Sequence, residues 1–121
     1  VTWNVNSIRS REAYVRAYLE ETAPDVLCIQ ELKAMEDQIP MSLFEDLNYH
    51  TAIHGQKSWN GVMIASKKPI SDVVKGFPGE ENGDARFIKA TVDGIPIVNL
   101  YCPQGQSAES PKFAYKKRFS P

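Results

Sequence analysis

One short apolar segment limits the possible folds of this chain more than any other. Residues 26–30 read VLCIQ, a nearly continuous apolar run without the polar–apolar alternation of a half-exposed strand. Such a run is typical of a β-strand that is covered on both faces. The chain must therefore place one layer above this strand and another below it. A carboxylate, Glu31, follows directly at its end.

The residues before and after this strand predict an α/β fold. We expect a strand over 1–5, a helix over 10–22 and a short helix over 39–48. Ser10 is the expected N-cap of the first helix, and Pro24 ends it. The i, i+3, i+4 pattern of that helix consists of Tyr14, Ala17, Tyr18 and Glu21. A helix of this length can cover one face of a sheet.

Beyond residue 48 strand patterns dominate, and the Asp93-Gly94 pair predicts a tight hairpin between the last two strands. The predicted strands are 49–53, 61–66, 70–75, 86–92 and 95–101. We therefore expect a mixed and largely antiparallel sheet with flanking helices. Two helices are too few to cover it, so a further covering layer is expected from residues beyond Pro121.

Composition and charge restrict the class of function. The 121 residues are the size of one domain, with a globular composition of 42% hydrophobic and 24% charged residues. No apolar run approaches the roughly 20 residues of a membrane span, and we expect a cytoplasmic protein without a membrane partner. The net charge of −1 means that a polyanion needs a local basic patch or a metal ion. Cys28 and Cys102 lie in apolar runs and are expected to be structural.

Polar side chains at the ends of two predicted strands form the first candidate site. Asn4 and Asn6 are two residues apart and would lie on the same side of a strand. If that strand neighbours 26–30, their amide oxygens approach Glu31. Carboxylate and amide oxygens suit Mg²⁺ or Mn²⁺. Alternatively, Asn6 caps the following turn and Glu31 only meets solvent.

Five segments, in order along the chain, carry a family resemblance. They are TWNVNSIR, PDVLCIQELK, YHTAIHGQKSWNGVMIASKKPI, GFPGEENGDARFIKA and IVNLYCPQGQS. Together they resemble the endonuclease/exonuclease/phosphatase superfamily, specifically its exonuclease III-like branch of abasic-site endonucleases. The resemblance covers nearly the whole chain and implies part of a four-layered α/β sandwich of the deoxyribonuclease I type. Residues 1–121 are then expected to be a single N-terminal portion of one such domain, without its C-terminal half.

The resemblance also implies roles for individual residues. Glu31 is implied to be the direct ligand of Mg²⁺ (or Mn²⁺), Asn4 to hold or orient the metal, and Asn6 to support it. Tyr101 is implied to contact the scissile phosphate, so Tyr101, Glu31 and Asn4 are the expected catalytic residues. The residues implied to lie near or contact DNA are Lys33, Gln56, Lys57, Trp59, Asn60, Arg86 and Gln104.

Without the resemblance, each of these residues has a structural interpretation. A tyrosine at a strand end, such as Tyr101, is usually a half-buried aromatic. Trp59 can simply anchor a turn, and Arg86 and Lys89 can belong to a solvated strand face. Two further titratable residues that match no catalytic position and are expected to be structural are His50 and His54.

Two motifs of the family do not occur in residues 1–121. They are the Asp-x-Asn motif in its Gly-Asp-x-Asn form, which handles the attacking water and the leaving group, and a late Ser-Asp-His. Without the histidine and its aspartate, the water lacks a general base. Glu31 as the single strong carboxylate should hold Mg²⁺ only weakly. We therefore expect this chain alone to have little or no nuclease activity.

The resulting prediction concerns the parent protein. It is a Mg²⁺-dependent DNA repair nuclease, an exodeoxyribonuclease III or abasic-site endonuclease, with 3′–5′ exonuclease activity and incision 5′ to abasic sites. The expected partner is double-stranded DNA with abasic sites or 3′ ends, bound by a cytoplasmic monomer that acts on nucleoid DNA. Two alternatives remain: a superfamily phosphatase or phosphodiesterase with non-DNA substrates, and a non-catalytic DNA-binding module.

Overall fold

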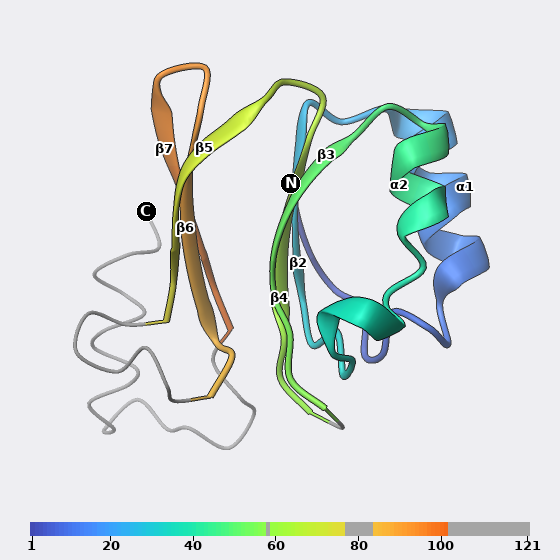
Figure 1. Ribbon diagram of the computed structural model, residues 1–121. Coiled ribbons are helices and arrows are strands. Elements are labelled where there is room, and N and C mark those ends of the chain that lie inside the picture. The colour runs from blue at the N-terminus through green and yellow to red at the C-terminus, as the bar shows by residue number, and fades with distance from the viewer. Residues whose placement is uncertain (58, 77–83, 102–121) are drawn as a thin grey trace.

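The computed structural model describes residues 1–57, 59–76 and 84–101, which form three successive layers (Figure 1). Two α-helices cover one face of a four-stranded sheet, and a three-stranded sheet packs on its other face. None of the helices in these residues is long and apolar enough to cross a membrane. The elements are β1 (Thr2–Asn4), α1 (Glu12–Thr22), β2 (Val26–Gln30), the 3₁₀ helix η1 (Glu36–Gln38), α2 (Met41–Asp46), β3 (His50–His54), β4 (Val62–Ser66), β5 (Ile70–Lys75), β6 (Phe87–Val92) and β7 (Ile95–Leu100).

The four-stranded sheet is mixed, as predicted. Its strand order is β1-β2-β4-β3. β1 runs parallel to β2, with Asn4 opposite Gln30, and both β2 and β3 run antiparallel to β4. Because β1 and β2 are parallel, the segments that follow them leave the sheet at the same end.

The central strand β2 is covered on both faces. Leu27 and Ile29 belong to the core beneath the helices, together with Val15 of α1. Cys28 faces the other way and packs against a second core between the two sheets, which contains Ile88 of β6. The prediction made from the uninterrupted apolar run is therefore confirmed. The alternating side chains serve two different cores.

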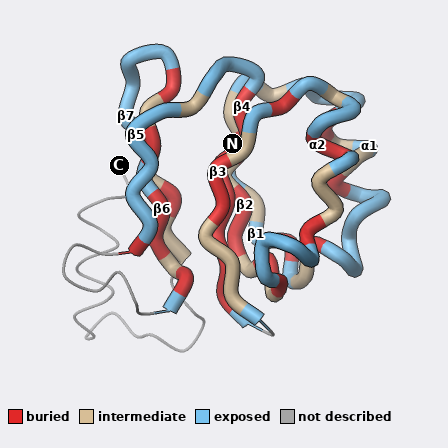
Figure 2. Tube along the Cα trace, in the orientation of Figure 1, coloured by how far each residue is buried: buried red, intermediate tan, exposed pale blue. Residues whose placement is uncertain are grey.

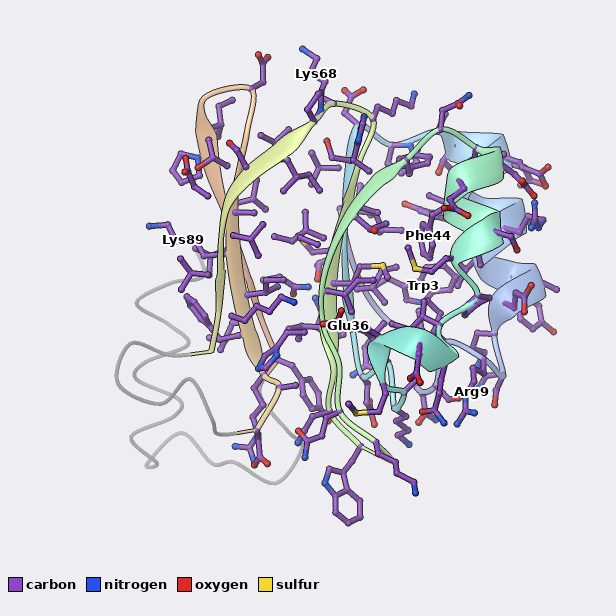
Figure 3. All side chains as sticks on the ribbon, in the orientation of Figure 1. Trp3, Arg9, Glu36, Phe44, Lys68 and Lys89 are labelled. Atoms are coloured by element: carbon purple, nitrogen blue, oxygen red, sulfur yellow. The ribbon has the colours of Figure 1, made fainter. Side chains whose placement is uncertain are left out.

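The three-stranded sheet, in the order β5-β6-β7, is antiparallel throughout. The predicted hairpin is confirmed: Val92 pairs with Ile95 around Asp93 and Gly94, whose φ angles of 53° and 76° are those of a tight two-residue turn. Strand β5 is largely exposed (Figure 2). Lys89 of β6 is exposed as well and points away from the four-stranded sheet (Figure 3).

The first helix starts later than predicted. Its first helical residue is Glu12, and the capping position is Arg11, whose side chain makes no capping bond. Ser10 lies in the preceding turn instead, where its main-chain N–H donates to Oγ of Ser7 over 3.4 Å. The prediction of Ser10 as the N-cap is therefore wrong, because a hydrogen-bonded turn from Ile8 to Arg11 precedes the helix.

The buried face of α1 also differs from the prediction. The buried residues are Val15 and Leu19, whereas Tyr14 is 66% exposed. Tyr18 is half-buried and its ring lies 5.2 Å from that of Trp3. The pairs 14/18 and 15/19 have the same spacing, so periodicity cannot separate them. The aliphatic pair is buried because it faces the core beneath the four-stranded sheet, and that choice is made by contacts distant in sequence.

Candidate active site

Two polar loops meet where β1 and β2 end. The main-chain N–H of Ser7 donates to the carbonyl of Glu31 over 2.9 Å, and that of Ile8 donates to Leu32 over 3.1 Å. These bonds continue the pairing of the two parallel strands beyond their ends. The loop that follows β1 therefore lies against Glu31.

Further main-chain bonds add segments from the rest of the chain to the same end of the sheets. The bonds run from Leu32 N to Gly61 O (3.1 Å), Lys33 N to Asn60 O (2.9 Å), Gly61 N to Ala85 O (2.8 Å) and Tyr101 N to Arg86 O (2.7 Å). This end of the sheets lies opposite the turn that carries Lys68 (Figure 3). Both sheets therefore contribute to one loop cluster, formed by residues 6–8, 31–33, 60–61, 85–86 and 101.

The loop cluster concentrates unusual backbone conformations. Nine non-glycine residues have positive φ among those that the structure describes. Five of them belong to the cluster: Asn6 (48°), Ser7 (85°), Glu31 (62°), Lys33 (54°) and Asn60 (59°). Each left-handed residue costs about 1–3 kcal/mol and persists only where surrounding contacts hold it. Such residues gather at functional sites, which makes the cluster the candidate active site.

Three of the predicted site residues come together here. Nζ of Lys33 lies 2.6 Å from Oδ1 of Asn6 and 3.5 Å from Oε1 of Glu31. The side chains of Lys33 and Glu31 are 33% and 20% exposed. Asn4 Oδ1 accepts a 3.1 Å hydrogen bond from the main-chain N–H of Asn6 and thus holds the turn that presents Asn6.

Asn6 reaches this position by a different route from the predicted one. Strand β1 ends at Asn4, and Asn6 lies in the following turn with a left-handed backbone. The expectation that Asn4 and Asn6 share one face of a strand is therefore wrong. Asn6 approaches Glu31 because the turn is held by the side chain of Asn4 and by the bond from Ser7 to the Glu31 carbonyl.

The donor chemistry of this group fits a hard divalent cation. It offers one carboxylate, Glu31, and amide oxygens, and Mg²⁺ is commonly held by one or two carboxylates with the remaining positions filled by water. The Lys33 ammonium, which contacts both Asn6 and Glu31, shows that these oxygens already stabilise a positive charge. Among the described residues no group of three or more His, Cys, Asp or Glu side chains could hold a metal. Within the described part of the chain, the candidate ligands are therefore Glu31 and neighbouring amides.

The loop predicted to contact DNA divides into two kinds of residue. Oε1 of Gln56 accepts from the main-chain N–H of Ala85 over 2.8 Å and from Nδ2 of Asn60 over 3.1 Å. Asn60 is 7% exposed. By contrast, Trp59 is 63% exposed and Lys57 is also on the surface. Gln56 and Asn60 therefore hold the loop, and Lys57 and Trp59 are presented to solvent.

Arg86 and Tyr101 bring the second sheet into the site. Nη2 of Arg86 lies 2.6 Å from Oδ2 of Asp84, and its side chain is only 20% exposed. The half-buried Tyr101 packs against the core between the sheets, at the end of β7. Lys89 lies on the outer side of its sheet, away from these residues (Figure 3). Gln104 and Cys102 lie outside the described residues.

An ion pair between two other residues lies close to His54, at the end of β3. Nζ of Lys75 lies 2.9 Å from Oε1 of Glu36, which links β5 to the 3₁₀ helix. Burial lowers the pKa of His54, and the charge of Lys75 lowers it further. Its Nε2 is buried and has no hydrogen-bond partner among the described residues. His54 is therefore disposed to remain neutral.

Two residues that the sequence analysis did not single out lie directly behind the site. Gln30 and Asn99 are 9% and 2% exposed, and Nε2 of Gln30 lies 2.6 Å from Oδ1 of Asn99. The available signal was a polar amide within or at the end of an otherwise apolar strand, VLCIQ and IPIVNL. Such a residue needs a buried partner, but the sequence does not say which.

Comparison with known proteins finds relatives that are named as nucleases and a phosphatase. A 34% identical relative, exodeoxyribonuclease III of Haemophilus influenzae, aligns with 98% of this chain and 47% of its own length. The 3′ phosphatase NExo from Neisseria, solved with a product DNA hairpin, matches with a TM-score of 0.82 and 39% identity over 98% of this chain and 46% of its own. An AP endonuclease from Archaeoglobus fulgidus matches with a TM-score of 0.82 and 42% identity over 97% and 46%.

The chain thus spans about half the length of these relatives. Its mixed and antiparallel sheets with few helices confirm the predicted deoxyribonuclease I-like α/β fold. The family model described as "Endonuclease/Exonuclease/phosphatase family" matches residues 1–119. The chain belongs to the endonuclease/exonuclease/phosphatase family.

Proposed function

We propose that the protein carrying this chain is a DNA repair nuclease that hydrolyses phosphodiester bonds with the help of Mg²⁺ (or Mn²⁺). The observation that carries the proposal is the convergence of Asn6, Glu31 and Lys33 in a loop cluster that also contains Tyr101. Relatives named as an exodeoxyribonuclease, a 3′ phosphatase and an AP endonuclease support it.

Each residue has a distinct task in this proposal. Glu31 binds the divalent cation, and Asn6 offers a second oxygen that Asn4 orients through the turn. A bound Mg²⁺ would draw charge from the phosphate oxygens during hydrolysis. The hydroxyl of Tyr101 donates a hydrogen bond to a non-bridging oxygen of the scissile phosphate.

The proposed substrate is double-stranded DNA with abasic sites or 3′ ends. Lys57 neutralises a backbone phosphate, and the exposed ring of Trp59 can stack on a base or sugar beside the cut. Gln56 and Arg86 shape this surface through their bonds to the 84–85 segment, and Asn60 supports it through its bond to Gln56. The proposed reactions are 3′–5′ exonucleolytic hydrolysis and incision 5′ to the abasic site.

Residues 1–121 constitute, in this proposal, the N-terminal portion of one domain. The share of each relative that the chain covers, 47% for the exodeoxyribonuclease, supports this. The Gly-Asp-x-Asn and Ser-Asp-His motifs do not occur in residues 1–121, so the chain alone should not cleave DNA. We further propose that the whole protein acts as a monomer in the cytoplasm.

The decisive experiment measures cleavage of an abasic-site duplex by the whole protein with and without Mg²⁺. Glu31→Gln should lower kcat by at least about 100-fold, because it removes the charged ligand proposed among the described residues. Glu20→Gln, which changes an exposed carboxylate of α1, is the matched control and should leave the rate unchanged. Faster hydrolysis of inositol phosphates than of abasic DNA would instead identify a phosphatase. DNA binding without any cleavage would identify a binding module.

A further inference from the structure

Two buried amides join the sheets behind the candidate active site. Nε2 of Gln30, the last residue of β2, donates to Oδ1 of Asn99 in β7 and to Oγ1 of Thr2, both over 2.6 Å. Nδ2 of Asn99 donates to the carbonyl of Ile29 over 2.9 Å and to that of Met63 over 2.8 Å. One side chain of the second sheet therefore holds two strands of the first.

Stability alone does not explain amides at this position. The surrounding contact between the sheets is apolar and includes Cys28, Ile64 and Ile97. Replacing both partners of a buried hydrogen bond by apolar groups of the same shape is often close to neutral for stability. A fully bonded polar network differs from an apolar contact in that it permits only one arrangement of its partners. The amides therefore define how the two sheets are placed relative to each other.

The position of the pair relates this placement to the proposed chemistry. Gln30 directly precedes Glu31, and Asn99 lies two residues before Tyr101. Main-chain bonds hold both strand ends: the N–H of Ser7 donates to the Glu31 carbonyl, and the N–H of Tyr101 donates to the Arg86 carbonyl. A shift of one sheet against the other would therefore move the carboxylate relative to the tyrosine.

We propose that Gln30 and Asn99 form a positioning pair that sets the placement of the Glu31 carboxylate relative to the Tyr101 hydroxyl. This inference rests on the proposed function, since it concerns the two residues that would bind the cation and the phosphate. Neither amide contacts the substrate in this proposal. The pair acts through the strand ends that carry Glu31 and Tyr101.

The test uses the whole protein and the variant Asn99→Leu, which keeps the branched shape and number of heavy atoms of the side chain and removes all of its hydrogen bonds. Ile97→Ala is the matched control, because it weakens the same contact between the sheets two residues away and leaves the amides in place. Both variants are compared at temperatures that lie equally far below their unfolding midpoints. Any difference between them then comes from the amides and not from lost stability.

Two readouts separate positioning from general structure. The first is the split between kcat and KM on abasic duplex: Asn99→Leu should lower kcat roughly 10–100-fold with KM within about twofold, as expected for a small misplacement of reacting groups. The second is ¹⁹F NMR of protein labelled with 3-fluorotyrosine, in which the Tyr101 signal is assigned by Tyr101→Phe. Addition of Mg²⁺ should shift this signal in the unmodified protein and in Ile97→Ala, and should shift it much less in Asn99→Leu.

The inference is overturned if Asn99→Leu matches Ile97→Ala in both readouts. If Asn99→Leu does not fold, Gln30→Met carries the same test, because it keeps both bonds from Asn99 to the main chain and removes the bonds that the Gln30 amide donates to Asn99 and Thr2. An unmodified protein that neither binds Mg²⁺ nor cleaves DNA would refute the proposed function instead. That result is obtained with the unmodified protein, before any variant is compared. Failure of the proposed function can therefore be distinguished from failure of the positioning role.

Discussion

Nζ of Lys33 lies 2.6 Å from Oδ1 of Asn6, so the site proposed to bind a divalent cation contains a positive charge supplied by the protein itself. The same ammonium lies 3.5 Å from Oε1 of Glu31. It therefore balances the charge of the carboxylate and also occupies the space that a cation shared by these two oxygens would need.

Removal of this ammonium should strengthen metal binding. In Lys33→Met the affinity for Mn²⁺ should rise about fivefold, because the repulsion between two nearby cations at a partly exposed site is about 1 kcal/mol. Titration calorimetry with Mn²⁺ measures the change, and Lys67→Met, an exposed lysine at the far turn, is the control. Unchanged or weaker binding in Lys33→Met would show that the lysine assists the metal and does not compete with it.

The close contact between two loops of the site depends on one glycine. Gly61 has a φ of +96°, and a Cβ there would lie 2.8 Å from Cβ of Leu32. Gly94 also has a positive φ, +76°, but a Cβ there would have nothing within 4 Å. Both alanine variants should lose about 1 kcal/mol to backbone strain, and Gly61→Ala should lose a further 1–3 kcal/mol, roughly, to crowding. Urea unfolding of the two variants measures this difference, and equal losses would contradict it.

Substitutions at the neighbouring residues Gln56 and Lys57 should affect different properties: the first should lower stability, and the second should change DNA binding. Gln56→Leu leaves the N–H of Ala85 without its acceptor and should cost about 1–3 kcal/mol of stability. Lys57→Met should leave stability within about 0.5 kcal/mol but reduce the salt dependence of DNA binding by about one unit of slope. Fluorescence anisotropy at several salt concentrations, together with urea unfolding, tests both. A salt slope that Lys57→Met leaves unchanged would exclude a phosphate contact.

The neutral state of His54 should make stability depend on pH. Burial and the charge of Lys75 lower the pKa of His54 below 6.5, so the unfolded chain binds a proton before the folded protein does. This contribution to stability is present above pH 6.5 and is lost as the pH falls from 6.5 towards the lowered pKa of the folded state. In Lys75→Met an NMR titration should find a higher pKa for His54. The stability curve should then be flatter below pH 6.5, and an unchanged pKa would rule out the proposed cause.

The strands could be predicted because their causes are local. The uninterrupted run of residues 26–30 indicated a strand covered on both faces, and the Asp93-Gly94 pair indicated the hairpin. The buried face of α1 could not be chosen, because the pairs 14/18 and 15/19 fit one period equally well. The choice depends on what the sheet offers opposite the helix, which is set by contacts distant in sequence.

The site was predicted by residue type but not by geometry. The left-handed backbones of Asn6, Glu31 and Lys33 are held by bonds to segments far along the chain, such as the one from Lys33 to Asn60. No local pattern indicates them. The Gln30–Asn99 pair joins residues 69 positions apart, so neither amide identifies its partner.

The line of bonds from Ser7 through Leu32, Gly61 and Ala85 is made by the backbone and not by side chains. Amide and carbonyl groups are the same for almost every amino acid, so this framework does not depend on which residues it displays. Side chains at positions such as 57 and 59 can change without loss of the scaffold that presents them. The family name joins endonucleases, exonucleases and phosphatases. Such a range of activities is expected where surface side chains can change while the main-chain framework that presents them stays the same.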